Sequence, residues 1–175
     1  MLVLGIDLGL QFDNPSAWAL LDFPSIGPVT VRDYAEIVPR STTWQDRVAE
    51  IGIAILRRID LTTPDLVAYE AAHLGRNAQT LRKLSCIEGA ILLAAAAHAI
   101  PAQDVQPKQS KVALASDATA TKQMMIDAAK LLYKVNGGDH IADAIGHALA
   151  GEGLFRRAQL IAAHRPTIAR RAGKK

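Results

Sequence analysis

Four side chains in this sequence are candidates for one shared chemical site: Asp7, Glu70, His140 and Asp143. Each of the first two acids ends a short apolar stretch, which is typical of the last residue of a buried strand. His140 and Asp143 are three residues apart, so on a helix both side chains lie on one face, a turn apart. Two strand ends and one helix face could therefore bring three carboxylates and an imidazole together.

The chemistry of such a group is the binding of divalent cations. A carboxylate at the end of an apolar strand is costly unless it is solvated, paired or bound to a cation. Converging acids repel each other, and a divalent ion relieves the repulsion; oxygen ligands suit Mg²⁺ or Mn²⁺. Two such ions roughly 3.5–4 Å apart activate a water and hold the leaving oxygen of a phosphodiester. Spacing alone leaves a simpler interpretation open, in which these residues are a turn cap, a surface acid and an exposed helix turn.

The elements that position these residues follow from the periodicity of the sequence. Short apolar stretches between loops rich in Pro, Asn and Gly predict three antiparallel strands, at 2–8, 16–22 and 29–37. Two further strands are predicted at 66–70 and 102–106, and they alternate with helices. This order predicts an α/β domain with a mixed five-stranded sheet, three antiparallel strands followed by two parallel ones.

The helices are predicted from apolar residues three or four positions apart. Thr43 begins a helix with Val48, Ile51, Ile55 and Ile59 on one face, and a long helix runs from about Asn77 to His98. Shorter helices are predicted at about 108–115, 119–134 and 139–150. Residues 1–153 are expected to form one domain, and residues 154–175 a basic extension that is a weaker helix or a tail.

Composition excludes several classes of protein. The chain has 175 residues, enough for one domain, with 50% hydrophobic and 21% charged residues, which is typical of a globular protein. Its one cysteine, Cys86, excludes an intrachain disulfide and a cysteine-based zinc site. The longest apolar run, 90–97, is shorter than the roughly 20 residues of a membrane span, and the N-terminus lacks the basic start of a signal peptide. We therefore expect a cytoplasmic protein without membrane contact.

The formal net charge of +3 is unevenly distributed along the chain. Residues 151–175 hold seven basic residues and one acid, a formal charge of +6, whereas residues 1–150 hold 13 basic and 16 acidic residues, a formal charge of −3. An acidic body with a basic end suggests a polyanionic partner.

A series of motifs in a fixed order identifies the chain as similar to a known family. The motifs are Gly5-Ile6-Asp7-Leu8-Gly9; Ser16-Ala17-Trp18-Ala19; Glu70 with Arg76-Asn77-Ala78 after it; Leu84 to Gly89; Pro107 and Lys111, with Lys122 eleven residues later; and His140-Ile141-Ala142-Asp143-Ala144. Together they resemble the RuvC family of Holliday junction resolvases, within the RNase H-like nuclease superfamily, from Met1 to about Gly151. The differing loops are compatible with a phage or otherwise divergent member, in which case the cytoplasm would be the host's.

The resemblance implies an RNase H-like fold and a metal-dependent, structure-selective endonuclease of DNA recombination and repair. It implies that Asp7, Glu70, His140 and Asp143 are catalytic and bind two Mg²⁺ or Mn²⁺ ions; the family has Asp or His at the position of His140. The expected reaction is resolution of Holliday junctions by paired symmetric nicks that leave 5′-phosphate and 3′-hydroxyl ends. Asp139 is a second choice for the ligand at His140, because one residue along a helix turns it about 100° away.

The resemblance also implies contacts to branched DNA and a homodimer. Lys111 and Lys122 are expected to hold phosphates near the cut, and Arg76 and Lys108 are further candidates for backbone contacts, which fix register without reading sequence. A two-fold dimer matches the symmetry of a four-way junction. His73 stands where the family often has an aromatic residue, and its ring can stack on an unpaired base.

The chain departs from the family between its two lysines. Ser116, Ala118 and Ala120 stand where a Gly-x-Gly-x-Ala stretch is usual, so this loop is expected to run closer to a helix. Three other functions remain open: a nuclease with broad preference for forks and flaps, a catalytically silent junction-binding module, and an ATPase of the actin-like or sugar-kinase class. The last needs a second related domain, for which the chain has no room.

Overall fold

The computed structural model describes residues 1–11, 13–72 and 77–172, with side chains described as far as His164. The described strands are β1 (Leu2–Asp7), β2 (Ser16–Asp22), β3 (Thr30–Ile37), β4 (Leu66–Glu70) and β5 (Ala102–Val105). The described helices are α1 (Trp44–Thr62), α2 (Ala78–Ala97), α3 (Pro107–Ala115), α4 (Lys122–Tyr133) and α5 (Asp139–Ala172).

The five strands form one mixed sheet in the order β3-β2-β1-β4-β5, which confirms the predicted α/β class. β1 and β3 are both antiparallel to β2, whereas β4 is parallel to β1 and β5 is parallel to β4. Ile6 of β1 is paired with Tyr69 of β4. The residues that follow this pair, Asp7 and Glu70, therefore end the two central strands at the same edge of the sheet.

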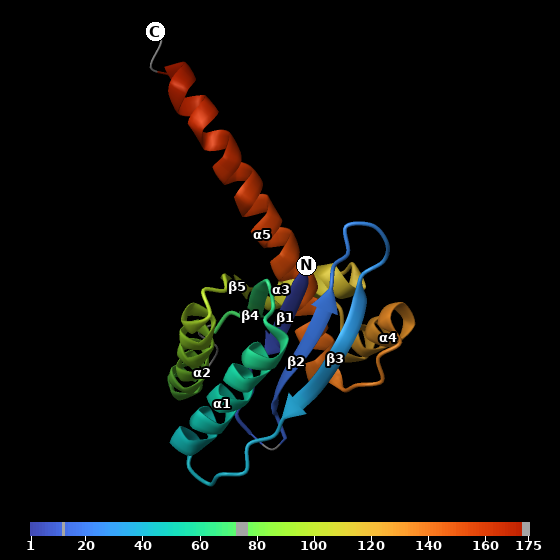
Figure 1. Ribbon diagram of the computed structural model, residues 1–175. Helices are drawn as coiled ribbons and strands as arrows, with labels where there is room; N and C mark the ends of the chain where they lie inside the picture. The colour runs from blue at the N-terminus through green and yellow to red at the C-terminus, as the bar shows by residue number, and fades with distance from the viewer. Residues whose placement is uncertain (12, 73–76, 173–175) are drawn as a thin grey trace.

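Helices cover both faces of the sheet and bury two separate apolar clusters (Figure 1). On one face, α1 and α2 pack on the side chains of Leu4, Ile6 and Val67; on the other, α3, α4 and the first part of α5 pack on Val3 and Ala68. Alternate residues of a strand point to opposite faces, so the continuous apolar runs of β1 and β4 feed both clusters.

Helix α1 follows the predicted pattern. The side-chain oxygen of Thr43 accepts a hydrogen bond from the backbone N–H of Asp46, which caps the helix, and Ile51, Ile55 and Ile59 are buried. Helix α2 is capped in the same way by Asn77. The predicted face of α1 is thus the buried one.

Helix α4 begins later than predicted, at Lys122 rather than near residue 119. Ser116 takes a left-handed backbone conformation that ends α3, and the Thr121 side chain accepts a hydrogen bond from the backbone N–H of Met124. Residues 116–121 therefore form a turn between α3 and α4, and the expectation that this loop runs closer to a helix is wrong.

Helix α5 is longer than predicted, because it continues without a break through residues 150–154 to Ala172. Its first part packs against β1, β2, β4 and α3, and its second part projects away from the body (Figure 1). The predicted boundary at residue 153 lies inside this helix. Among the described residues, no helix combines the length and apolarity that crossing a membrane requires.

Candidate metal centre

Helix α5 lies unusually close to the two central strands, and this contact sets the position of the site. A Cβ on Gly5 would collide with the carbonyl oxygen of Ala144 and lie 2.8 Å from the Cβ of Ala148. The side chain of Ala68 leaves similarly little room at Gly151. Glycine at these points lets the helix cross directly over the ends of β1 and β4.

Three residues of α5 share the face that meets Asp7. His140, Asp143 and His147 are spaced three and four residues apart, so they lie one above another along the helix. The Nδ1 atom of His140 lies 2.9 Å from Oδ2 of Asp7, and the Nε2 atom of His147 lies 3.7 Å from Oδ1 of the same carboxylate. The buried carboxylate of Asp7 thus has an imidazole on each side.

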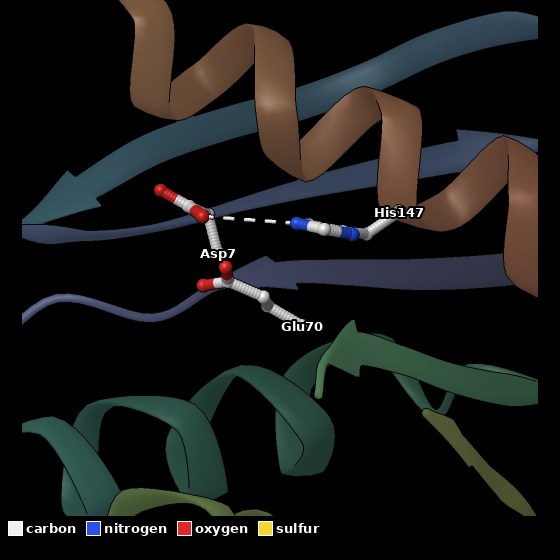
Figure 2. Close-up of side chains that lie close together, drawn as sticks. All are labelled: Asp7, Glu70 and His147. Carbon is white, nitrogen blue, oxygen red and sulfur yellow. Dashed lines mark ion pairs between the residues drawn. The ribbon is translucent and has the colours of Figure 1, made fainter. Parts of the chain in front are cut away.

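A possible metal-binding group is formed by Asp7, Glu70 and His147, each offering one ligand atom within 4.8 Å of the others. Figure 2 shows the three side chains pointing toward one another from β1, β4 and α5. His140 contacts the other carboxylate oxygen of Asp7, and Asp143 lies between the two histidines along the helix. A group of carboxylates and imidazoles with this spacing can hold divalent cations.

The electrostatics of Asp7 and His140 favour their charged forms when no metal is bound. Burial alone would raise the pKa of Asp7, but the imidazoles of His140 and His147 outweigh it and hold this pKa below its ordinary value. The hydrogen bond with Asp7 raises the pKa of His140. A metal that binds His140 must therefore displace a proton, which makes metal affinity depend on pH.

For Asp143, in contrast, the protonated form is favoured. Burial, reinforced by the nearby charge of Asp7, raises the pKa of Asp143 to about 6. Near neutral pH the site thus holds two partly buried carboxylates that repel each other. A divalent cation would remove this penalty, so the residues present fit a metal.

Asp139 points to a different partner. Its carboxylate forms an ion pair with the Nζ atom of Lys122, and this pairing lowers the pKa of Asp139 and raises that of Lys122. The carboxylates of Asp143 and Asp7 also raise the pKa of Lys122. The structure thus places Lys122 at the rim of the site, with Asp139 turned to the lysine.

The other predicted DNA contacts that the structure describes lie on α3. Lys108 is exposed in the first turn of α3, and Lys111 is half-buried one turn later. His73 and Arg76 lie outside the described residues. The roles of all these residues, and of the four predicted metal ligands, stay predictions.

Sequence reasoning missed His147. It stands four residues after Asp143 and seven after His140, so helical spacing already placed it on the same face. The signal was present, but the motif used to find the site ended at Ala144.

Comparison with known proteins points to one family. The family model for crossover junction endodeoxyribonuclease RuvC matches residues 3–151. The RuvC of Gloeobacter violaceus is 31% identical over 155 residues, covering 86% of this chain and 87% of that protein. The RuvC of Nitratidesulfovibrio vulgaris strain Hildenborough is 29% identical over 151 residues, covering 83% of this chain and 89% of that protein.

A solved structure agrees with the fold. The RuvC of T. thermophilus, determined in complex with Holliday junction substrate, superposes with a TM-score of 0.77 at 23% identity, over 90% of this chain and 96% of that one. The mixed sheet with flanking helices is thus the RNase H-like fold of RuvC. On the match of the family model to most of its length, the chain belongs to the RuvC family of crossover junction endodeoxyribonucleases.

Proposed function

We propose that this member of the family resolves Holliday junctions by paired symmetric nicks, using Asp7, Glu70, His140 and Asp143 as ligands of two Mg²⁺ or Mn²⁺ ions. The observation that carries the proposal is the meeting of β1, β4 and α5 around Asp7, whose carboxylate lies within 2.9 Å of His140. The raised pKa of Asp143, about 6, is a second support, because it marks a carboxylate whose burial, together with the charge of Asp7, outweighs the nearby imidazoles of His140 and His147.

In this mechanism the protein supplies position and charge. When bound, two divalent ions activate the attacking water and stabilise the leaving 3′-oxygen of the phosphodiester. Asp7 ends a strand buried on both faces, so its carboxylate is held rigidly between the helix and β4. Glu70 contributes its carboxylate from the end of the neighbouring strand β4, and α5 contributes the side chains of His140 and Asp143.

Lys122 is proposed to hold a phosphate next to the scissile bond. Its side chain is 75% exposed, and its ammonium group is held by Asp139 at the rim of the site. An exposed ion pair is weak, so a phosphate can compete for the lysine at little cost. Lys111 and Lys108 on α3, together with Arg76 and His73, are proposed to contact the arms of the branched DNA.

A homodimer is proposed to form through the outer surface of α1 and α2. Apolar side chains line a groove between these helices, including Ile53, Leu56 and Leu93, and the side chain of Leu93 is 73% exposed. Gly89 lies one turn before Leu93, and a Cβ there would meet nothing within 4 Å of the same chain. Exposed apolar side chains beside a glycine allow close approach of a second copy.

The proposal is tested by cleavage of three substrates under the same conditions: a mobile four-way junction, a replication fork and a linear duplex, each with Mg²⁺ or Mn²⁺. We expect symmetric nicks in the junction, ligatable because they carry 5′-phosphates and 3′-hydroxyls. Equal cutting of junction and fork would replace the resolvase with a nuclease of broad branched-DNA preference. Binding of the junction without any nicking, in either metal, would make the protein a silent binding module.

A further inference from the structure

We propose that His147 is a metal ligand, and that its Nε2 atom with the carboxylates of Asp7 and Glu70 forms a nitrogen-containing site that favours Mn²⁺ over Mg²⁺. This inference rests on the proposed metal-dependent function and adds a ligand from the second turn after His140. The site is formed where α5 crosses the ends of the two central strands (Figure 2).

The distances distinguish His147 from His140. His140 lies 2.9 Å from Asp7, which is a hydrogen-bond length, whereas His147 lies 3.7 Å from the other oxygen of that carboxylate, which is too long for one. Two ligands bound to one ion at about 2.1 Å and separated by 90–120° lie about 3.0–3.7 Å apart. The spacing of His147 and Asp7 thus fits two ligands of one ion better than a direct hydrogen bond.

The burial of His147 argues against a purely structural role. The residue is 1% exposed, and among the described residues its Nδ1 atom has no hydrogen-bond partner. Leaving a buried polar atom unpaired typically costs about 1–3 kcal/mol. A histidine that only filled the core would leave this cost without compensation, whereas the Nε2 atom of His147 faces the carboxylate of Asp7 within a group of possible metal ligands that includes Glu70.

The donor type sets the expected metal. Imidazole nitrogen is a softer ligand than the oxygens that Mg²⁺ requires, and it binds transition metals more readily. With His140 at one oxygen of Asp7 and His147 at the other, both positions around this carboxylate have a nitrogen donor available. We therefore expect Mn²⁺ to bind with higher affinity than Mg²⁺, and His147 to contribute part of the difference.

The first experiment is a titration of the full-length protein with Mn²⁺, followed by electron paramagnetic resonance of the free ion, with Mg²⁺ as competitor. His147→Gln is expected to weaken Mn²⁺ binding by at least about tenfold and Mg²⁺ binding much less. His164→Gln is the matched control, because it is the same change in an exposed part of the same helix, and it should change neither affinity. Unchanged Mn²⁺ affinity in folded His147→Gln protein would overturn the proposal.

A second measurement needs no change at His147. Pulsed magnetic resonance of the Mn²⁺-loaded protein detects ¹⁴N nuclei bound to the ion. In His140→Asp protein, which retains His147, the nitrogen coupling is expected to persist, and it should disappear when His147→Gln is added. Its absence from His140→Asp alone would exclude His147 as a ligand, even if His147→Gln failed to fold.

Junction cleavage by the wild type, measured in parallel, separates this inference from the proposed function. Nicking of the junction without a nitrogen signal from His147 would refute the ligand and leave the nuclease standing. A nitrogen signal without cleavage of any branched DNA would support the ligand and refute the proposed function.

Discussion

At the scale of single residues, the site is a set of charges that do not balance one another until a cation is added. Asp7 has an imidazole on each side, and the charged form of this carboxylate is stabilised. For Asp143, burial and the charge of Asp7 outweigh the same two imidazoles and raise the pKa to about 6. Two variants test this difference.

The first residue-scale prediction concerns Asp143→Asn without metal. Because folding raises the pKa of Asp143, the folded protein binds this proton more tightly than the unfolded chain, and stability falls as pH rises from about 4 to 6. Asparagine removes the charge, so the variant should be more stable than wild type above that window by about 1–3 kcal/mol. Near pH 4 the variant should be little more stable than wild type.

The measurement is urea unfolding in the presence of a chelator, at about pH 4 and about pH 8. A gain of equal size at both pH values would contradict the electrostatic explanation and point to packing.

The second residue-scale prediction concerns His140→Asp. Aspartate supplies the oxygen ligand that Mg²⁺ prefers, so the variant should retain Mg²⁺-supported nicking to within about tenfold and lose part of its activity with Mn²⁺. His140→Ala, which supplies no ligand, is the control and should lose activity with both ions. The nicking rate in each metal is the readout; complete loss in His140→Asp would mean that the histidine does more than bind metal.

At the scale of elements, the site depends on how closely α5 approaches the sheet. Gly5 has no side chain where the backbone of Ala144 passes, and this contact places the face of α5 that carries His140 and Asp143 over Asp7. A shift of the helix by the size of one methyl group would therefore move its ligands relative to both strands.

The prediction at this scale is that Gly5→Ala destabilises the protein by on the order of 3 kcal/mol and lowers nicking, because its Cβ would collide with a backbone oxygen that cannot move alone. Gly153→Ala, later in α5, is the matched control: a Cβ there meets nothing within 4 Å, so the change should stabilise the helix by about 1 kcal/mol. Thermal unfolding and nicking assays measure both. Equal effects of the two substitutions would contradict the close-contact explanation.

The same contact explains which parts of the structure follow from the sequence. Short apolar runs bounded by turn residues predict β1 to β5, and three-to-four spacing predicts the buried face of α1, because both are local patterns. The meeting of Asp7 and Glu70 follows from the parallel pairing of their strands. The place of His147 on the face that carries His140 and Asp143 also follows from spacing, but its distance from Asp7 depends on how closely α5 approaches Gly5, a contact between distant residues that spacing does not reveal.

The length of α5 was missed for a related reason. Residues 151–157 contain two glycines and two arginines, which weaken the apolar pattern, yet the helix continues through them. Helix propensity is a weak guide where an already formed helix can extend.

At the scale of the whole molecule, charge and shape favour a branched polyanion as substrate. The three acids of the site account for three of the negative charges on the body, and two divalent ions would bring its formal charge from −3 to about +1. The basic second part of α5 projects beyond the body, where it can reach DNA outside the site (Figure 1).

The prediction for the assembly concerns the groove between α1 and α2. Leu93→Glu places a charge on the exposed apolar surface proposed to bind a second copy, and it should convert the proposed dimer to a monomer because a buried unpaired charge is costly. Leu131→Glu, on the exposed surface of α4, is the matched control and should leave the mass unchanged. Light scattering gives the molecular mass of each variant in solution. A Leu93→Glu protein with the mass of a dimer would show that the interface lies on another surface.

The central claim is that the carboxylate of Asp7 is the shared ligand of a nuclease site. The most direct measurement compares wild type and Asp7→Asn on a mobile four-way junction, with binding followed in Ca²⁺ and nicking in Mg²⁺ or Mn²⁺. We expect Asp7→Asn to bind the junction with nearly unchanged affinity and to leave it uncut. Nicking by Asp7→Asn at the wild-type rate would show that this carboxylate is not a ligand of the nuclease site.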